Sequence, residues 1–294
     1  MELTAERLRG HLALRYEDVA QDGRLLLETL PVGLAVIWQK LLAPGTVRDA
    51  LLARGVIPIL TRLALEGAPG PFAMDHPLEV EGGYRLAHDV GDDGQVAKVL
   101  LDMDATLWGP KGRTNLPPPD DAGTRALAGQ VRAEHVFTRP FAPAGERKVL
   151  ALDFGGKPFV PAERRKWLAP ATVLDVPAGA AALDAGFVED SAKLALGLTH
   201  TDSNQHVNSL VYPRFFEEAA LRRIAALGRP TALLARELEV AYRRPSFAGE
   251  LLRAVVRVYE FGAKVVCTGA FFGEGEDAKD LKKARVFLRM TLEA

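Results

Sequence analysis

The amino-acid sequence predicts an α+β protein made of two tandem modules, each with one helix packed against an antiparallel sheet. Three observations support this fold class. In the last third of the chain, a segment with apolar residues at helical spacing is followed by segments that alternate with a period of two. The same order of elements recurs in the N-terminal half, and a stretch rich in Pro, Gly and Ala lies between the halves. One helix on an antiparallel sheet buries the apolar face of each element.

The second module has a strand and then a helix over residues 209–227. Asn208 is a suitable N-cap, and Gly228 followed by Pro230 is a stop signal. Pro213 falls in the first turn, where a missing N–H is tolerated. Four strands are expected next, in the segments LEVAYRR, LRAVVRVY, KVVCTGAFF and ARVFLRMTLE. The second and fourth of these alternate clearly, so one buried face is predicted for each.

The first module repeats this order, with a strand in LALRYEDV and a helix in ETLPVGLAVIWQKLLA. Asp18 is set against Asp202 and Pro31 against Pro213, with a two-residue difference in length between the copies. Four further strands are expected in PILTRLALE, LEVEGGYRLAH, QVAKVLLDMDATLW and VRAEHVFTRPF. The segment between the copies is predicted to be a linker with one short helix, PAERRKWLA. The expected organisation is a first module over residues 1–150, a linker over 151–190 and a second module over 191–294.

The composition excludes several classes of protein. Of the 294 residues 48% are hydrophobic and 26% charged, as in ordinary globular proteins, and the formal net charge is −1. No basic excess indicates binding to nucleic acid or to an anionic membrane, and no apolar run is long enough to span a bilayer. Cys267 is the single cysteine, so an internal disulfide and CxxC zinc sites are excluded. A reducing, cytoplasmic location is expected, because the N-terminus also lacks the apolar region of a secretion signal.

The segment HTDSNQHVNSLVYPRFFEEAAL, residues 200–221, is the strongest functional signal. An acid, an amide and a histidine occupy alternate positions directly before the predicted helix. Asp and Asn are common as caps and turn formers, and that structural interpretation stands for each residue taken alone. Taken together, they would place a base, a proton carrier and a hydrogen-bond donor at the positive end of a helix. This combination suits acyl transfer to water.

The motif DSNQHVNSLVY matches the D-x-N-x-H-V-N-x-x-x-Y signature of hotdog-fold thioesterases. The chain resembles most closely the double-hotdog acyl-ACP thioesterases, since YRRP is similar to their Tyr-Arg-Arg strand and VPAERRKWLAP to the linker between their hotdogs. The resemblance implies two tandem hotdog modules, each with a long central helix wrapped by an antiparallel sheet, and the sheets joined side by side. It also implies a degenerate, non-catalytic first module that shapes the acyl pocket, and one active site per chain without metal or cofactor.

Carried over residue by residue, the resemblance assigns the catalytic set to Asp202, Asn204 and His206. In the family an acidic residue directly follows the Tyr-Arg-Arg run, whereas here Pro245 occupies that place. Water would be activated by Asp202, or by His206 held by Asn204, and direct attack by the carboxylate remains an alternative. Neither Glu217 nor Glu218, farther along the helix, is assumed to replace the missing acid. The residues expected to contact substrate are Asn208, Tyr212, Arg243 and Arg244.

Six arginines in and after the helix allow two interpretations. They form either a solvated face or a patch for the phosphates of coenzyme A or phosphopantetheine, or for an acidic carrier protein. The six residues are Arg222, Arg223, Arg229, Arg236, Arg243 and Arg244. The expected partners are therefore an acyl carrier protein or a coenzyme A thioester, and the oligomeric state is a monomer or a homodimer.

Other functions are weighed against hydrolysis of a thioester. No G-x-S-x-G or metal-ligand spacing occurs. The second candidate is a non-hydrolytic hotdog that binds acyl chains or a carrier protein, and a hotdog dehydratase ranks lower. Cys267 is expected in the core, and His200 either near the site or on the surface. The remaining histidines are expected to be structural or solvated: His11, His76, His88 and His135.

Overall fold

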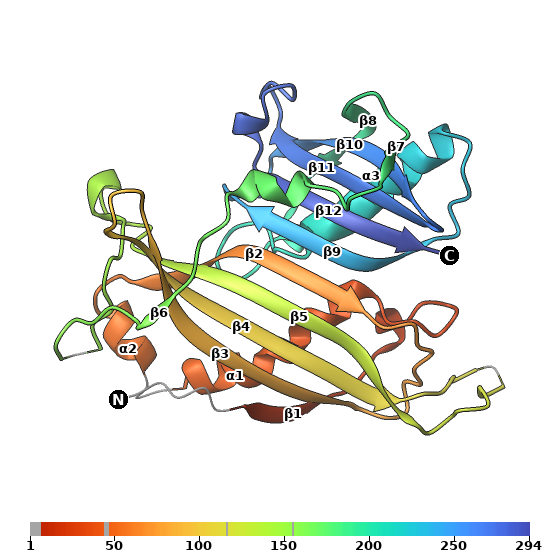
Figure 1. Cartoon of the computed structure of the whole chain (residues 1–294), viewed down its shortest axis with the longest axis horizontal. Helices are drawn as coiled ribbons and strands as arrows, with labels where there is room; N and C mark the ends of the chain where they lie inside the picture. The colour runs from red at the N-terminus through yellow and green to blue at the C-terminus, as the bar shows by residue number, and fades with distance from the viewer. Residues whose placement is uncertain (1–6, 44–46, 116, 155) are drawn as a thin grey trace. The chain divides into compact units, whose positions relative to one another are not determined.

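The computed structural model describes residues 7–43, 47–115, 117–154 and 156–294 (Figure 1). The chain divides into two compact units. The first comprises most residues up to Leu168, and the second runs from Ala169 to Ala294. Two short segments of the N-terminal half, Leu26–Glu28 and Ala64–Gly67, group with the second unit. The change of unit falls inside the segment predicted as a linker.

The first unit is built on a sheet in the order β1-β3-β4-β5-β2. The pairs β1–β3, β3–β4 and β4–β5 are antiparallel. Four of these strands are confirmed predictions, whereas the first strand lies earlier than expected and the end of LALRYEDV forms a 3-10 helix, Tyr16–Asp18. The strands are β1 Leu8–Leu12, β2 Ile57–Gly67, β3 Leu78–Val90, β4 Val96–Pro110 and β5 Arg125–Thr138.

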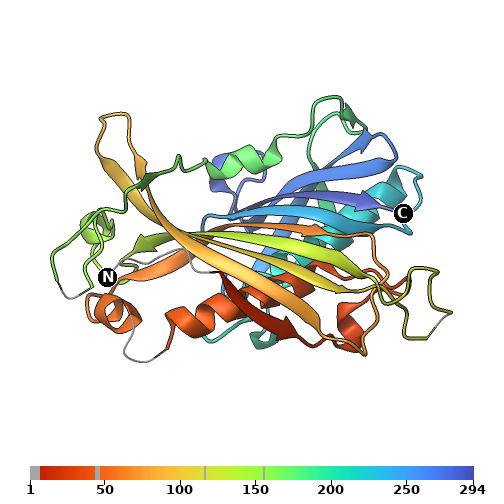
Figure 2. The ribbon, with the colours of Figure 1, turned by 60° about the horizontal axis from the view of Figure 1, so that its bottom comes forward.

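The long helix predicted for the first unit is wrong. A 3-10 helix, Leu27–Leu34, contains Pro31 and is followed by a short α-helix, α1, Ala35–Leu41. Pro31 cannot donate a backbone hydrogen bond, which weakens an α-helix at this point. Helix α1 contacts β1 and β3 (Figure 2), and buried Ile37 packs close to Gly82, where a Cβ atom would lie 3.2 Å from its side chain. A further short helix, α2 Val47–Leu52, precedes β2.

The helix predicted in PAERRKWLA is also wrong. Its residues Glu163–Arg164 form β6, which pairs in parallel with β3. The N–H of Arg165 donates to the carbonyl of His88 at 2.9 Å, and its guanidinium pairs with Asp102 and Glu134. The segment is extended because the edge of the sheet offers backbone partners and buried carboxylates that a helix could not reach.

The second unit is built on the antiparallel sheet β9-β12-β11-β10, with β7 and β8 both paired to β10. The four strands predicted after the helix are thus confirmed, and the fourth, β12, inserts between the first and the third. The strands are β7 Ala181–Ala182, β8 Val188–Ala195, β9 Leu234–Tyr242, β10 Leu251–Phe261, β11 Lys264–Gly273 and β12 Val286–Glu293.

Helix α3, Val211–Ala226, covers one face of this sheet (Figure 1) and confirms the predicted helix, although it begins two residues later. Its Phe216 is fully buried, and the ring packs edge-on against Phe271 of β11 at a centroid distance of 6.4 Å. Gly269 of β11 makes this approach possible, because a Cβ there would lie 2.6 Å from Phe216 and 2.1 Å from the carbonyl oxygen of Val255.

The opposite face of the sheet is covered as well. A 3-10 helix, Pro170–Leu174, packs there and buries Val173 in a cluster with Ala241 and Phe287. As a result β12 is buried on both faces, and the prediction of one buried face for this strand is wrong. The reason lies in the chain segment before the module, which period-two alternation within the strand cannot report.

Gly269→Ala is expected to destabilise the second unit by at least ~2 kcal/mol, because the added methyl group meets backbone and a buried ring rather than a flexible side chain. Urea or guanidinium unfolding measures the change. Gly186→Ala is the matched control, since a Cβ at that glycine has no neighbour within 4 Å. Equal stability of the two variants would contradict the close packing of α3 on β11.

Candidate active site

The motif residues lie on a tight turn just before α3. Thr201 and Val207 form an antiparallel bridge, the N–H of Asp202 donates to the carbonyl of His206 at 3.1 Å, and the N–H of Gln205 donates to the carbonyl of Asp202 at 3.0 Å. Gln205 has a φ of 64°, a left-handed conformation that non-glycine residues adopt rarely. The turn therefore places Asp202 and His206 opposite each other, although four positions separate them in the sequence.

The side chains of the predicted catalytic set share this turn. The Oδ1 atom of Asp202 accepts the N–H of Asn204 at 2.8 Å, and its Oδ2 lies 3.5 Å from the Nδ2 atom of Asn208. The Nδ1 atom of His206 lies 3.2 Å from the carbonyl oxygen of Val207. Since a carbonyl only accepts, Nδ1 carries the proton and Nε2 of the neutral imidazole keeps its lone pair. Asp202 and His206 are partly buried, and Asn204 is exposed.

Asn208 organises the start of the helix rather than capping it directly. Its Oδ1 accepts the N–H of Leu210 at 2.9 Å, and its carbonyl accepts the N–H of Val211 at 3.1 Å. Pro213 has no N–H to offer. The backbone N–H groups of Leu210 and Val211 therefore already donate to Asn208. The side chain of Asn204, seven positions before the first residue of α3, is exposed.

Three contacts hold the turn from behind. The N–H of Val207 donates to the carbonyl of Ser246 at 2.8 Å, and the N–H of Asn208 donates to the carbonyl of His200 at 2.9 Å. The phenol of Tyr242 donates to the carbonyl of Ser209 at 3.0 Å, and burial raises the pKa of Tyr242 far above its usual value, so the donor proton is kept. His200 thus supports the turn with its backbone.

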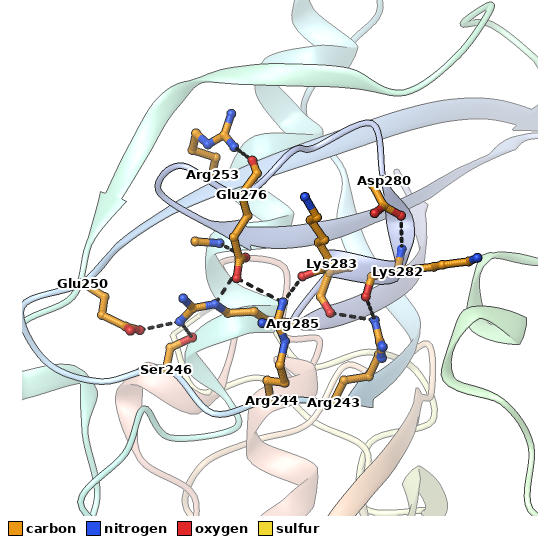
Figure 3. A network of polar contacts seen from close by, with 12 residues as sticks. Arg243, Arg244, Ser246, Glu250, Arg253, Glu276, Asp280, Lys282, Lys283 and Arg285 are labelled. Atoms are coloured by element: carbon orange, nitrogen blue, oxygen red, sulfur yellow. Dashed lines mark hydrogen bonds and ion pairs between the residues drawn. The ribbon is translucent and has the colours of Figure 1, made fainter.

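The predicted substrate-binding residues lie in different surroundings. Tyr212 is 2% exposed and its ring packs against Tyr242 and Phe271, so its side chain belongs to the core. Arg243 donates to the carbonyls of Lys282 and Ala284, and Arg244 pairs with Glu276 at 3.1 Å (Figure 3). Both guanidinium groups are thus engaged with the loop before β12, residues 274–285.

The other arginines of the predicted cluster are also paired. Arg222 pairs with Asp190, Arg223 with Asp184, Arg229 with Glu260 and Arg236 with Glu293. Each guanidinium has an acidic partner within the same unit. This pairing favours a structural role for the cluster over a patch reserved for phosphate.

Glu217 does not supply the acid missing at Pro245. Its carboxylate accepts the N–H of Ala235 at 3.3 Å, and Pro245 itself is exposed. Burial, together with the nearby Glu28, raises the pKa of Glu217 to about 7. A carboxyl group with this pKa holds its proton in mildly acidic solution.

The first unit contains the same backbone turn, but with other side chains in place of the predicted catalytic set. Val19 and Leu25 form the same bridge, the N–H of Ala20 donates to the carbonyl of Arg24 at 2.8 Å, and Gly23 has a φ of 88°. Ala20 therefore stands at the place of Asp202, and Arg24 at the place of His206, with no insertion or deletion up to the two prolines. The predicted two-residue difference in length is wrong.

Asp18 corresponds instead to His200, since both accept the N–H of the residue three positions earlier. Burial opposes ionisation of Asp18, but hydrogen bonds from Arg15 outweigh it and lower the pKa. Beside the turn of the first unit lies a pocket of about 190 Å³ lined by Tyr16, Phe72 and Arg113, among others. Asp22, at the place of Asn204, pairs with Arg24 at 2.6 Å. This turn has no base opposite an imidazole.

Known structures of tandem hotdog proteins match the whole chain. The putative oleoyl thioesterase of Lactobacillus plantarum matches with 13% identity and a TM-score of 0.63, over 99% of this chain and 98% of that one. The 12:0-ACP thioesterase of Umbellularia californica matches with 16% identity and a TM-score of 0.59, over 98% and 94%. An acyl-ACP thioesterase of Bacteroides thetaiotaomicron matches with 14% identity and a TM-score of 0.54, over 98% of both. The chain is a tandem hotdog protein.

The family comparison is more specific for the second unit. Residues 204–277 match the model of the Thioesterase superfamily, and all of them lie in the second unit. The match begins inside the turn at Asn204 and extends through α3 to the loop after β11. No curated protein matches the sequence.

The described part of the chain contains neither a candidate metal site nor a candidate membrane-spanning helix. No group of three or more His, Cys, Asp or Glu side chains is arranged to hold a metal ion among the described residues. None of the described helices combines the length and the apolar composition needed to cross a membrane.

Sequence reasoning missed the residues that support the turn. Ser246 and Arg285 contact each other, and Ser246 holds Val207 through its carbonyl. The only signal in the sequence was the departure at Pro245, which marks where the chain leaves the predicted strand. Contacts between residues this far apart leave no periodic pattern.

Glu217 gives a pH-dependent prediction. Its pKa is about 7 in the folded chain against 4.5 for a free side chain, so the folded state binds the extra proton between these values. The contribution of this group to stability therefore falls as pH rises from 4.5 to 7. Glu217→Gln is expected to be ~1–3 kcal/mol more stable than wild type at pH 8 and unchanged at pH 4.5.

Denaturant unfolding at the two pH values measures this difference. Glu218→Gln is the matched control, because Glu218 is exposed and pairs only loosely with Arg222 at 3.6 Å. A stabilisation of the Glu217 variant that is the same at both pH values would contradict a buried, proton-binding carboxyl group.

Proposed function

We propose that the protein hydrolyses fatty acyl thioesters of an acyl carrier protein or of coenzyme A to the free acid and the thiol. The observation that carries this proposal is the turn 202–206. A backbone hydrogen bond across this turn joins Asp202 and His206 just before α3, and the imidazole of His206 keeps Nε2 as a base when neutral. The match to the Thioesterase superfamily model, which begins within this turn at Asn204, and the thioesterases among the structural neighbours support it.

In the proposed mechanism Nε2 of His206 takes a proton from water, and the water oxygen attacks the thioester carbonyl carbon. The side-chain amide of Asn204 and the positive end of α3 stabilise the resulting oxyanion. The charge of Asp202 stabilises the imidazolium that forms. Collapse of the intermediate breaks the C–S bond, and the imidazolium returns its proton to the leaving thiolate.

The other predicted residues take supporting roles in this proposal. Asn208 orients Asp202 and the helix start, Tyr212 supports them from the core, and Arg243 and Arg244 hold the adjoining loop. The first unit is non-catalytic, because its turn lacks counterparts of Asp202 and His206. We also place the protein in the cytoplasm, in fatty acid metabolism. Burial raises the pKa of the free Cys267 thiol to about 12, so this residue stays an inert part of the core.

A second candidate function is binding of acyl chains without hydrolysis. Pro245 favours it, since it occupies the place of the acid that follows Tyr-Arg-Arg in the double-hotdog thioesterases and no other carboxylate of α3 replaces it. Measuring both hydrolysis of acyl thioesters and binding of acyl chains distinguishes the two functions: a hydrolase releases thiol, whereas a binding protein only retains the acyl chain.

Release of free thiol from a panel of acyl-CoA and acyl-carrier-protein thioesters tests the proposal. Asp202→Asn is the sharper variant of the acid, since an amide oxygen can still accept the N–H of Asn204 and keep the turn. Both Asp202→Asn and His206→Ala are expected to lower kcat by at least ~100-fold, because a charge or a general base is lost.

Arg24→Ala is the matched control, since Arg24 occupies the place of His206 in the first unit. Its turnover is expected to stay within about twofold of wild type. Absence of turnover on every substrate, in a folded protein that still binds acyl chains, would reject hydrolysis and favour the binding function. Loss of turnover in Arg24→Ala would contradict one active site per chain.

A further inference from the structure

Ser246 is a fully buried polar residue in the loop 243–250 that connects β9 to β10. It makes contacts in three directions. Its carbonyl accepts the N–H of Val207 at 2.8 Å, its Oγ accepts from Nη1 of Arg285 at 3.3 Å, and it shares a hydrogen bond with the phenol of Tyr212. Ser246 therefore contacts both ends of the segment from the turn to the first helical residues of α3.

Arg285 fixes Ser246 in place. Its guanidinium pairs with Glu250 at 2.5 Å and with Glu276 at 3.4 Å (Figure 3). The Arg285 side chain is 15% exposed and that of Glu276 is 19% exposed, so these charges are largely removed from water. Burial opposes ionisation of Glu276, but the N–H of Gly273 and the nearby guanidinium groups lower its pKa. Glu276 therefore remains a charged partner of Arg285 in neutral solution.

The loop 274–285 anchors this arrangement from the other side. Arg244 pairs with Glu276, and Arg243 donates to the carbonyls of Lys282 and Ala284. The backbone N–H groups of Arg243 and Arg244 donate to the carbonyl of Arg285 at 2.9 and 3.2 Å. The two loops thus hold each other in one register, and Figure 3 shows Ser246, Glu250 and Glu276 around the guanidinium of Arg285.

We propose that Arg285 and Ser246 are positioning residues of the active site, which fix His206 through the hydrogen bond from Val207 to the carbonyl of Ser246. This inference rests on the proposed hydrolysis. Val207 directly follows His206, and its own carbonyl is the acceptor for Nδ1 of that imidazole. Moving the Val207 peptide therefore moves the group that sets the tautomer and orientation of His206. In this chain the ion pairs of Arg285 with Glu250 and Glu276 support the loop after β9, where the double-hotdog thioesterases have an acidic residue in place of Pro245.

The test combines kinetics with amide hydrogen exchange at Val207. Arg285→Gln removes the charge that orders the loop, and kcat is expected to fall about tenfold with KM within about twofold. Exchange of the Val207 N–H is expected to become about tenfold faster. Ser246→Ala, which keeps the carbonyl but loses the Oγ contact, is expected to shift both quantities in the same direction by a smaller factor. Arg285→Lys, which can still pair with one carboxylate, should recover part of the loss.

Arg289→Gln is the matched control, because Arg289 lies on β12, close to Arg285 in the sequence, and likewise pairs with a glutamate, Glu239, at 2.7 Å. It should leave kcat and Val207 exchange unchanged. Unchanged kcat and exchange in Arg285→Gln, or equal losses in Arg289→Gln, would overturn the proposal. If Arg285→Gln does not fold, Ser246→Ala and Glu250→Gln decide by the same readouts. A wild-type chain without turnover would reject hydrolysis alone, since the exchange measurement still tests whether Arg285 holds Val207.

Discussion

The backbone pairing that closes the turn before α3 is the constraint on which the candidate site depends. The N–H of Asp202 and the carbonyl of His206 meet across the turn, and Gln205 accepts a left-handed conformation to allow it. Because of this closure, Asp202 and His206, which are four positions apart in the sequence, lie opposite each other across the turn. The turn remains when its side chains change, because the first unit closes in the same way with Ala20 and Arg24. The shape of the turn is therefore set by backbone hydrogen bonds, and its side chains can differ between the two copies.

Gln205 carries a conformational cost that its counterpart in the first copy avoids. Glycine adopts the required φ without strain and does so at Gly23 of the first copy. The second copy carries the strained residue in the turn that holds the proposed catalytic residues, and contacts from Ser246, His200 and Tyr242 hold this segment in place. A strained backbone position supported by its surroundings is common at functional sites.

Much of the second unit could be predicted from the sequence, because its signals are local. Helix α3 and strands β9–β12 follow from periodicity, and the turn from a spaced motif. The linker strand β6 could not be predicted, since it is extended only because β3 offers it a partner. Likewise, the register between the copies depends on backbone hydrogen bonds, whereas similarity of residue type suggested Asp18 rather than Ala20 as the counterpart of Asp202. The contact between Ser246 and Arg285 joins positions 39 apart in the sequence, which no local pattern reports.

The strand order of the second unit has a consequence for how the chain folds. β12 comes last in the sequence, yet it lies between β9 and β11. The sheet therefore cannot assemble by adding hairpins in chain order, and its central pairing must wait for a long-range closure, which is typically slow. Until β12 arrives, the facing edges of β9 and β11 lack their partner and offer template surfaces to other chains. The last strand thus governs both completion of the core and the period during which the nascent unit can aggregate.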